Sequence, residues 1–272
     1  NGDFYSPDGY QTTALPMSSG DEYHTSCTGG RPSDGAFPYF RLTGENHGYN
    51  LAIGWPGQWS ASFEASGSGV RIKAGQESFC AYLLPGETVR SPRITVTAFE
   101  GNNERGINAW RRFYLSHVLP RSGGEPLTAK NCAMFHGGDE SDEFVRATEQ
   151  NQIAAIDSFI SRGCKPDIWW IDAGWYPCKN ERGQNKWYRT GNWKPAPERF
   201  PNGLGPVGRH CEQNGIDFLL WFEPERIRLE GEHLAPDEYL IFTPEDKLHA
   251  LLWLGNSRAR NWLTELVDGI IK

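Results

Sequence analysis

The sequence predicts an α+β chain of more than one domain: an antiparallel β-sandwich followed by a (β/α)8 barrel, of which the first three or four βα units are present. Three observations lead to this prediction. Apolar residues alternate with polar ones between Gly- and Pro-containing turns over residues 36–101, which is typical of half-buried strands. The period becomes helical at Ile107. After residue 126, short apolar runs alternate with helical segments, as in parallel sheets whose strands are joined by helices.

The composition allows a packed core and excludes several classes of protein. Hydrophobic residues make up 38% and charged residues 22% of the 272, so we expect one large domain or two ordinary ones. The formal net charge of -7 disfavours a nucleic-acid partner, and no apolar run approaches the roughly 18 residues of a membrane span. The six cysteines form no C-x-x-C pair and the seven histidines form no metal-binding motif. We therefore expect reduced, mostly buried thiols and no metal; a disulfide bond is left open.

The two ends of the chain are expected to be cut ends of a longer protein. The chain starts at Asn1 without Met and without a signal peptide, and a helical pattern over residues 257–272 runs into Lys272 with no Gly stop. The localisation is left open with a preference for the cytoplasm, and secretion stays open because the true N-terminus is absent. Assembly into a homo-oligomer is left open as well.

Residues 1–105 are expected to form the sandwich. Residues 1–35, rich in Gly, Ser, Thr and Asp, should form loops and edge strands. The strand candidates after them are 51–55, 60–65, 70–73, 79–84 and 94–99. Residues 106–126 should form a linking helix and a linker. The helical stripe consists of Ile107, Trp110, Tyr114 and Val118, and Pro120 ends it.

Residues 127–272 are expected to form the barrel units. Strands are predicted at 131–135, 167–172 and 217–223, all parallel with the second in the middle, and 251–254 is a candidate fourth strand. Helices are predicted from a cap at Ser141 or Asp142 to Gly163, from Leu204 to Asn214, and after a cap at Asn256 or Ser257. A complete barrel takes about 250 residues, and roughly half as many follow the linker. Either the sheet is small and open or the rest of a barrel is absent, and the uncapped last helix favours the second alternative.

Two of the expected strands lead into carboxylates and tryptophans. Asp172 and Trp175 follow one strand, and Trp221, Glu223 and Glu225 follow the other. The C-terminal ends of parallel strands meet at one edge, where ligands bind. Carboxylates accept hydrogen bonds from hydroxyl groups and indole rings pack on sugar faces, which predicts a carbohydrate site. A structural role stays open for each residue alone, because strand-end carboxylates often cap helices and strand tryptophans are usually core.

Four motifs resemble those of one enzyme family. They are residues 169–175 (WWIDAGW), 191–193 (GNW), 199–204 (RFPNGL) and 220–225 (LWFEPE). On these motifs the chain resembles melibiase-type α-galactosidases, glycoside hydrolase family 36, from roughly Trp55 to its end. In the first part the resemblance rests on residues 85–87 (PGE) and their neighbours, which are similar to the later strands of the family's N-terminal β-supersandwich.

The resemblance implies a retaining glycosidase that needs no cofactor and cleaves terminal α-galactosyl units through a covalent glycosyl-enzyme. It places both catalytic carboxylates beyond Lys272, so the chain alone is expected to be inactive. It assigns the motif of Glu223 and Glu225 to shaping the pocket rather than attacking the sugar. The implied partner is an α-linked galactosyl or galactosamine-type oligosaccharide. Two alternatives stay open: an α-N-acetylgalactosaminidase or α-galactosaminidase of the same family, and a non-catalytic carbohydrate-binding module.

The resemblance also assigns roles to single residues. Asp172 matches the first of two adjacent aspartates that hold galactose hydroxyls, Trp221 an aromatic wall, and Trp193 the Trp of a loop beside the site. With Trp175, Glu223 and Lys247 these are the expected substrate-binding residues. The chain departs from the family at three positions. Ala173 stands where the second aspartate is expected, Lys247 where an Arg is expected by a looser match, and Asn192 where an Asp is usual. The loss of an acidic hydroxyl acceptor predicts a changed sugar preference or a compensating residue.

Overall fold

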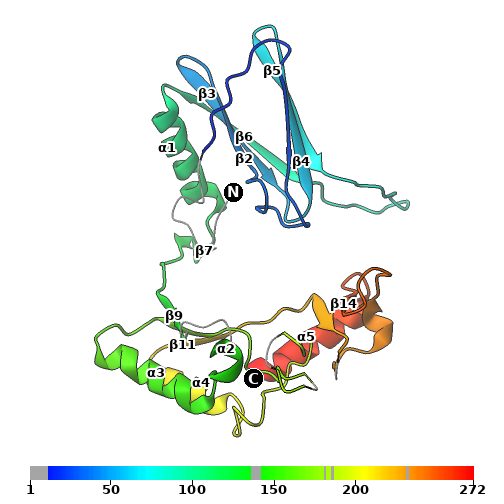
Figure 1. The fold of residues 1–272 in the computed structure, drawn as a ribbon. Coiled ribbons are helices and arrows are strands. Elements are labelled where there is room, and N and C mark those ends of the chain that lie inside the picture. The colour runs from blue at the N-terminus through cyan, green and yellow to red at the C-terminus, as the bar shows by residue number, and fades with distance from the viewer. Residues whose placement is uncertain (1–11, 136–141, 181, 185–186, 231–232) are drawn as a thin grey trace. The chain divides into compact units, whose positions relative to one another are not determined.

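The computed structural model describes residues 12–135, 142–180, 182–184, 187–230 and 233–272. The chain forms two compact units, Asn1–Leu127 and Thr128–Lys272, each described here by itself (Figure 1). The first unit contains antiparallel sheets and the second contains parallel strands connected by helices. This order, antiparallel first and parallel second, confirms the prediction.

The first unit is a sandwich of two three-stranded antiparallel sheets. One sheet has the order β1 (Glu22–Ser26), β4 (Trp59–Ser66), β5 (Gly69–Gln76). The other has the order β2 (Tyr39–Thr43), β3 (His47–Gly54), β6 (Arg93–Glu100). Alternate residues of both sheets meet in one buried cluster, with Trp59 and Phe63 from β4 and Leu51 and Ile53 from β3. β1 is an edge strand, as expected for residues 1–35.

The strand predicted at 79–84 is wrong. This segment has no regular structure, and its side chains are exposed, Tyr82 to 84%. Its apolar run looks like a strand, but a strand forms only where a neighbour pairs with its backbone N–H and C=O groups. In the described part of the chain, no such neighbour lies beside this run.

The linking helix begins earlier than its apolar stripe predicts. α1 (Asn103–Phe113) starts after Asn102, whose Oδ1 accepts a hydrogen bond from the Arg105 N–H at 3.1 Å, and continues as a π-helical segment (Tyr114–Val118). It ends before Pro120, as predicted. A short hairpin of β7 (Arg121–Ser122) and β8 (Glu125–Pro126) follows.

The second unit is built on a parallel sheet of the order β11 (Asp217–Leu220), β10 (Ile168–Ile171), β9 (Cys132–Met134). Ile168 pairs with Cys132 on one side and with Asp217 on the other. The prediction that the 167–172 segment lies between the other two, all parallel, is confirmed. The strand predicted to reach Glu223 ends at Leu220 instead.

Two helices of this unit, α3 (Glu149–Ser161) and α4 (Gly205–Gln213), lie against the same face of the sheet, and the short helix α2 (Asp142–Val145) precedes them. The Trp169 indole N–H, on β10, donates to Gln152 Oε1 of α3 at 2.8 Å. The single helix predicted up to Gly163 is wrong, because Thr148 interrupts it and caps α3 by accepting from the Asn151 N–H at 3.1 Å. The proposed cap Ser141 and the segment 136–139 lie outside the described residues.

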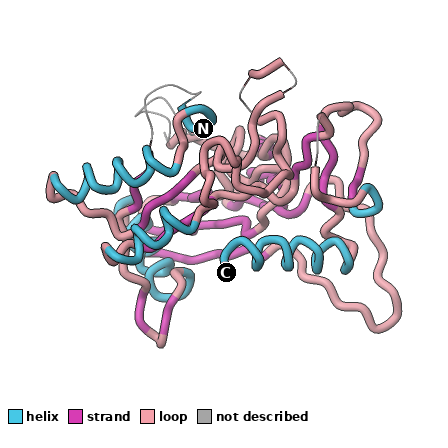
Figure 2. The backbone as a smooth tube through the Cα atoms, turned by 90° about the horizontal axis from the view of Figure 1, so that it is seen from below, coloured by secondary structure: helices cyan, strands magenta, loops and turns pink. Residues whose placement is uncertain are grey.

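The candidate fourth parallel strand is also wrong. β14 (His249–Leu252) exists but pairs antiparallel with β12 (Arg226–Arg228) and β13 (Leu240–Ile241), next to a 3-10 turn (Asp237–Tyr239). Its alternating burial is typical of antiparallel strands, since one face only is covered. The last helix, α5 (Ser257–Ile271), begins after Asn256, whose Oδ1 accepts from the Arg258 N–H, and leads to the C-terminus (Figure 2). No helix among the described residues is both long and apolar enough to cross a membrane.

The six cysteines are free thiols, and half of them rather than most are buried. Cys27, Cys178 and Cys211 are buried, whereas Cys80, Cys132 and Cys164 are exposed. Burial raises the pKa of Cys178 and of Cys211 to about 11, because the thiolate would lose its hydration.

We expect an aromatic disulfide reagent at pH 8 to modify the three exposed thiols of the native chain rapidly and the three buried ones only in denaturant. Peptide mapping identifies the modified cysteines. As a control, Cys80→Ser should lower the number of rapidly modified thiols by one. Rapid labelling of Cys178 would contradict the prediction.

Candidate functional site

Asp172 and Trp221 lie side by side where the parallel sheet ends. Ile171 pairs with Leu220, and the Trp221 N–H donates to the Ile171 carbonyl oxygen at 3.0 Å, so the next residue of each chain segment leaves the sheet at the same edge. Both side chains are half-buried. Asp172 Oδ1 accepts from the Ala173 N–H at 2.8 Å, and no described residue donates to its other oxygen. One carboxylate oxygen beside an accessible indole is therefore available to a ligand hydroxyl.

Trp175 and Trp193 form the buried support of Trp221. They are 0% and 1% exposed, and their rings stack with centroids 6.0 Å apart. The Trp175 indole N–H donates to the Trp221 carbonyl oxygen at 3.0 Å, and the Trp193 ring lies 6.1 Å from the Trp221 ring. Both residues were predicted to bind substrate. The structure places them behind Trp221, in the apolar core that also contains Ala173.

The loop that carries Trp193 is fastened by buried hydrogen bonds. The Ala196 N–H donates to the Trp175 carbonyl oxygen at 2.8 Å, and Arg199 Nη2 donates to the Tyr176 carbonyl oxygen at 2.6 Å. Burial raises the pKa of the Tyr176 hydroxyl above its usual value. Asn192 Oδ1 is buried and accepts no hydrogen bond from the described residues. These bonds tie the part of the loop around Ala196 and Arg199 to the segment that follows β10.

Trp187 belongs to the site although its sequence pattern did not identify it. Its ring lies 5.4 Å from the Trp221 ring and 5.0 Å from the Phe144 ring. Its carbonyl oxygen accepts from the Thr190 hydroxyl at 3.1 Å. Its one signal in the sequence is its position in the segment 176–202, which is unusually long for a loop.

Glu223 forms an ion pair with Arg226. Glu223 Oε1 accepts from Arg226 Nε at 2.5 Å and Oε2 from Nη2 at 2.7 Å, a two-pronged pair whose side chains are 26% and 32% exposed. The Arg226 guanidinium also lies over the Trp187 ring, 5.7 Å from its centroid. Glu225 is exposed, and its carbonyl oxygen accepts from the Leu252 N–H. Both glutamates lie beyond the end of β11, in the irregular segment before β12.

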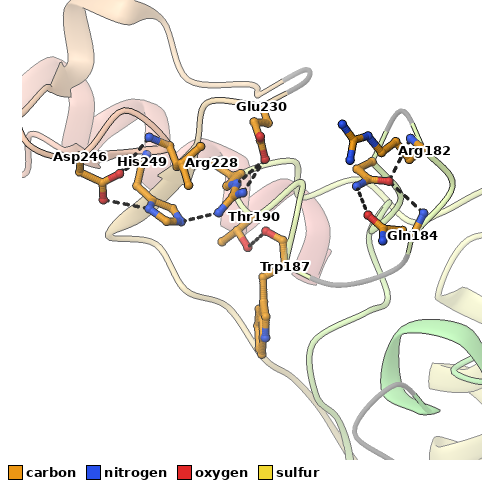
Figure 3. A network of polar contacts seen from close by, with 10 residues as sticks. Arg182, Gln184, Trp187, Thr190, Arg228, Glu230, Asp246 and His249 are labelled. Carbon is orange, nitrogen blue, oxygen red and sulfur yellow. Dashed lines mark hydrogen bonds and ion pairs between the residues drawn. The ribbon is translucent and has the colours of Figure 1, made fainter.

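A polar network joins β12 to β14 (Figure 3). Arg228 donates to Glu230 through Nε at 3.0 Å and to His249 Nε2 through Nη1 at 3.0 Å. Because a guanidinium only donates, His249 Nε2 accepts, and Nδ1–H donates to Asp246 at 2.9 Å. The Leu248 N–H and His249 together lower the pKa of Asp246. This network ends in the turn that carries Lys247, an exposed side chain that makes no hydrogen bond or ion pair with the described residues of the site.

No group of three or more His, Cys, Asp or Glu side chains within the described ranges could hold a metal ion. What the site offers is an acidic oxygen, an accessible indole and two rigid aromatic supports. This arrangement suits recognition of a neutral ligand rich in hydroxyl groups.

Part of the chain matches a known protein family, and the chain is similar to curated α-galactosidases. Residues 149–250 match the melibiase family. The chain is 23% identical over 214 residues to α-galactosidase Mel36A of Lactobacillus acidophilus; the alignment covers 75% of this chain and 27% of that protein. It is 32% identical over 231 residues to α-galactosidase 2 of Pediococcus pentosaceus, and this alignment covers 81% of this chain and 30% of that protein. The resemblance predicted from the four motifs is confirmed.

A solved structure shares the fold. A variant of the glycoside hydrolase family 36 α-galactosidase AgaA from Geobacillus stearothermophilus, in complex with raffinose, matches with a TM-score of 0.76 and 17% identity over 94% of this chain. The match covers 36% of that enzyme. The chain thus spans less than a third of the two curated relatives named above and little more than a third of this solved one.

Proposed function

Because residues 149–250 of this chain are a melibiase-family segment related to α-galactosidases, we propose that the chain supplies the sugar-binding part of a glycosidase acting on terminal α-galactosyl units. The observation that carries the proposal is the pair formed by Asp172 and Trp221 at the C-terminal edge of the parallel sheet, inside the matched segment. An oligosaccharide with an α-linked galactose, of the kind bound in the AgaA complex, is the proposed partner.

The two residues would divide the recognition between them. The Asp172 oxygen that no described residue engages accepts hydrogen bonds from ring hydroxyls, and the charge on the acceptor makes these bonds roughly twice as strong as neutral ones. Trp221 packs against the apolar face of the sugar, held by Trp175 and Trp193. Glu223 and Lys247 remain predicted contacts: Glu223 has oxygen lone pairs left besides its pair with Arg226, and Lys247 is exposed.

The reaction we propose is hydrolysis with retention through a covalent glycosyl-enzyme, with both catalytic carboxylates outside the present residues. Neither glutamate of the 220–225 motif suits these roles, since Glu223 is paired with Arg226 and Glu225 is exposed beyond the strand.

We expect that the 272-residue chain does not cleave an activated aryl α-galactoside, so that no coloured phenol is released. Turnover by this chain that disappears in Glu223→Gln or Glu225→Gln would place the chemistry on these residues and overturn the assignment.

A second candidate, an enzyme for N-acetylgalactosamine or galactosamine, is favoured by one observation. Ala173 stands where the family's second aspartate is expected, and its methyl group is buried at 1% exposure in the apolar core. A galactose hydroxyl would then lack an acidic hydrogen-bond acceptor in the pocket. A sugar with an acetamido or amino group in place of a hydroxyl presents a different polar group, so it needs different hydrogen-bond partners. Comparing the affinity of the chain for methyl α-galactoside and for its N-acetylgalactosamine counterpart decides between the candidates. A preference of about a hundredfold for the plain galactoside, near 2.7 kcal/mol, would remove the second one.

A further inference from the structure

Two arginines on β12 each lie over an aromatic ring of the loop between Tyr176 and Asn202. Arg226 lies over Trp187 at 5.7 Å and Arg228 over Tyr188 at 5.5 Å. They are two residues apart on one strand, so both side chains leave the same face, with buried Ile227 on the other. The backbone holds the loop here too, because the Arg228 N–H donates to the Thr190 carbonyl oxygen at 2.8 Å.

The two arginines differ in the residues to which they connect. The Trp187 ring continues to Trp221, 5.4 Å away, at the sugar-facing end of β11. Arg228 instead hydrogen-bonds to Glu230 and to His249 of the neighbouring strand β14, and Trp187 points away from this network (Figure 3). Only Arg226 is therefore connected through a single ring to the side chain that is proposed to meet the ligand.

Arg226 is itself fixed. Its Nε and Nη2 groups hold both oxygens of Glu223, so the plane of the guanidinium has one orientation above Trp187. Trp187 is confined on another side by the Phe144 ring, 5.0 Å away. A displacement of Arg226 thus uncovers Trp187, one of the two tryptophan rings that lie beside Trp221.

We propose that Arg226, held by Glu223, is a positioning residue that acts through Trp187 to set the orientation of Trp221 against the bound sugar. This inference rests on the proposed function for its ligand, and on the geometry of four described residues for its mechanism. It also gives Glu223 a role that needs no contact with the ligand. If Arg226 were merely part of the packed core, its substitution would lower the stability of the second unit but would leave the orientation of Trp221 and the affinity for raffinose unchanged.

The experiment compares Arg226→Lys with the matched control Arg228→Lys in the 272-residue chain. Lysine keeps the charge but cannot hold a carboxylate with two parallel bonds or lie flat over a ring. The first readout is the indole N–H resonance of Trp221, assigned as the signal missing in Trp221→Phe. The second is the dissociation constant of raffinose, measured by the same spectra in a titration.

We expect Arg226→Lys to shift the Trp221 resonance and to weaken raffinose binding about tenfold. Arg228→Lys should leave that resonance in place and the affinity within about twofold. Equal effects of both variants, or an unmoved Trp221 signal in Arg226→Lys, would overturn the inference. If Arg226→Lys fails to fold, Glu223→Gln loosens the same guanidinium without changing shape and is expected to give the same shift. Failure of the unaltered chain to bind any α-galactoside would count against the proposed function, while the resonance comparison would still decide the positioning role.

Discussion

Replacing Gly174 by alanine should prevent stable folding of the second unit, with a loss of more than about 4 kcal/mol in the free energy of unfolding. Gly174 adopts a φ of +96°, a region that costs an L-residue roughly 1–2 kcal/mol. A Cβ at this position would also overlap the Glu143 carbonyl oxygen and come within 2.8 Å of the carbonyl carbon. Because the obstacle is backbone, it cannot rotate away as a side chain would. Chemical denaturation followed by circular dichroism measures the loss.

The matched control for this substitution is Gly203→Ala. Gly203 has a φ of +69°, but a Cβ there would meet no heavy atom within 4 Å. We expect this variant to lose only the conformational part, about 1–2 kcal/mol. Similar losses for the two variants would show that the tight approach of residue 174 to α2 does not hold in solution.

Changing Asp172 to asparagine should weaken binding of methyl α-galactoside by about ten- to a hundredfold, equivalent to roughly 1.5–3 kcal/mol for hydrogen bonds to a charged group. The substitution keeps the shape and the acceptor for the Ala173 N–H while it removes the charge from the oxygen that the described residues leave open. Stability should change little, because the side chain is only half-buried.

The control is Asp167→Asn, just before the start of β10. Asp167 Oδ2 accepts from the Asn131 N–H at 2.8 Å, so this aspartate has a structural bond far along the strand from the site. Its substitution should leave the affinity for the galactoside unchanged. An affinity in Asp172→Asn within a few-fold of that of the unaltered chain would mean that Asp172 is a structural cap.

The central part of the fold was predictable because local patterns and long-range pairing agree there. The run from Ile168 to Ile171 is bulky and partly β-branched, is too short for a helix and follows a Gly-terminated helix, so its strand state and its parallel neighbours follow from the sequence. The proximity of Asp172 to Trp221 follows in turn, since strands in register bring their next residues together.

Other parts depend on contacts that no local pattern encodes. The run at 79–84 carries the side chains of a strand, yet nothing in the described chain pairs with it. The helical period across residues 142–163 hides the cap at Thr148, because threonine fits both a helix and its beginning. The Trp187 ring lies beside Trp221 and is covered by Arg226, which stands 39 positions later in the sequence; the spacing of aromatic residues in the loop gives no hint of these contacts.

The central claim, that the edge formed by Asp172 and Trp221 binds an α-galactosyl unit, is tested most directly by titrating the 272-residue chain with raffinose while its indole N–H resonances are followed. We predict that the Trp221 signal moves in a saturable way, and that the signals of Trp59 and Trp110 in the first unit stay fixed. Glucose at the same concentrations should leave Trp221 unmoved. A saturable shift confined to Trp59 or Trp110, or no shift of Trp221 at saturating raffinose, would contradict the account.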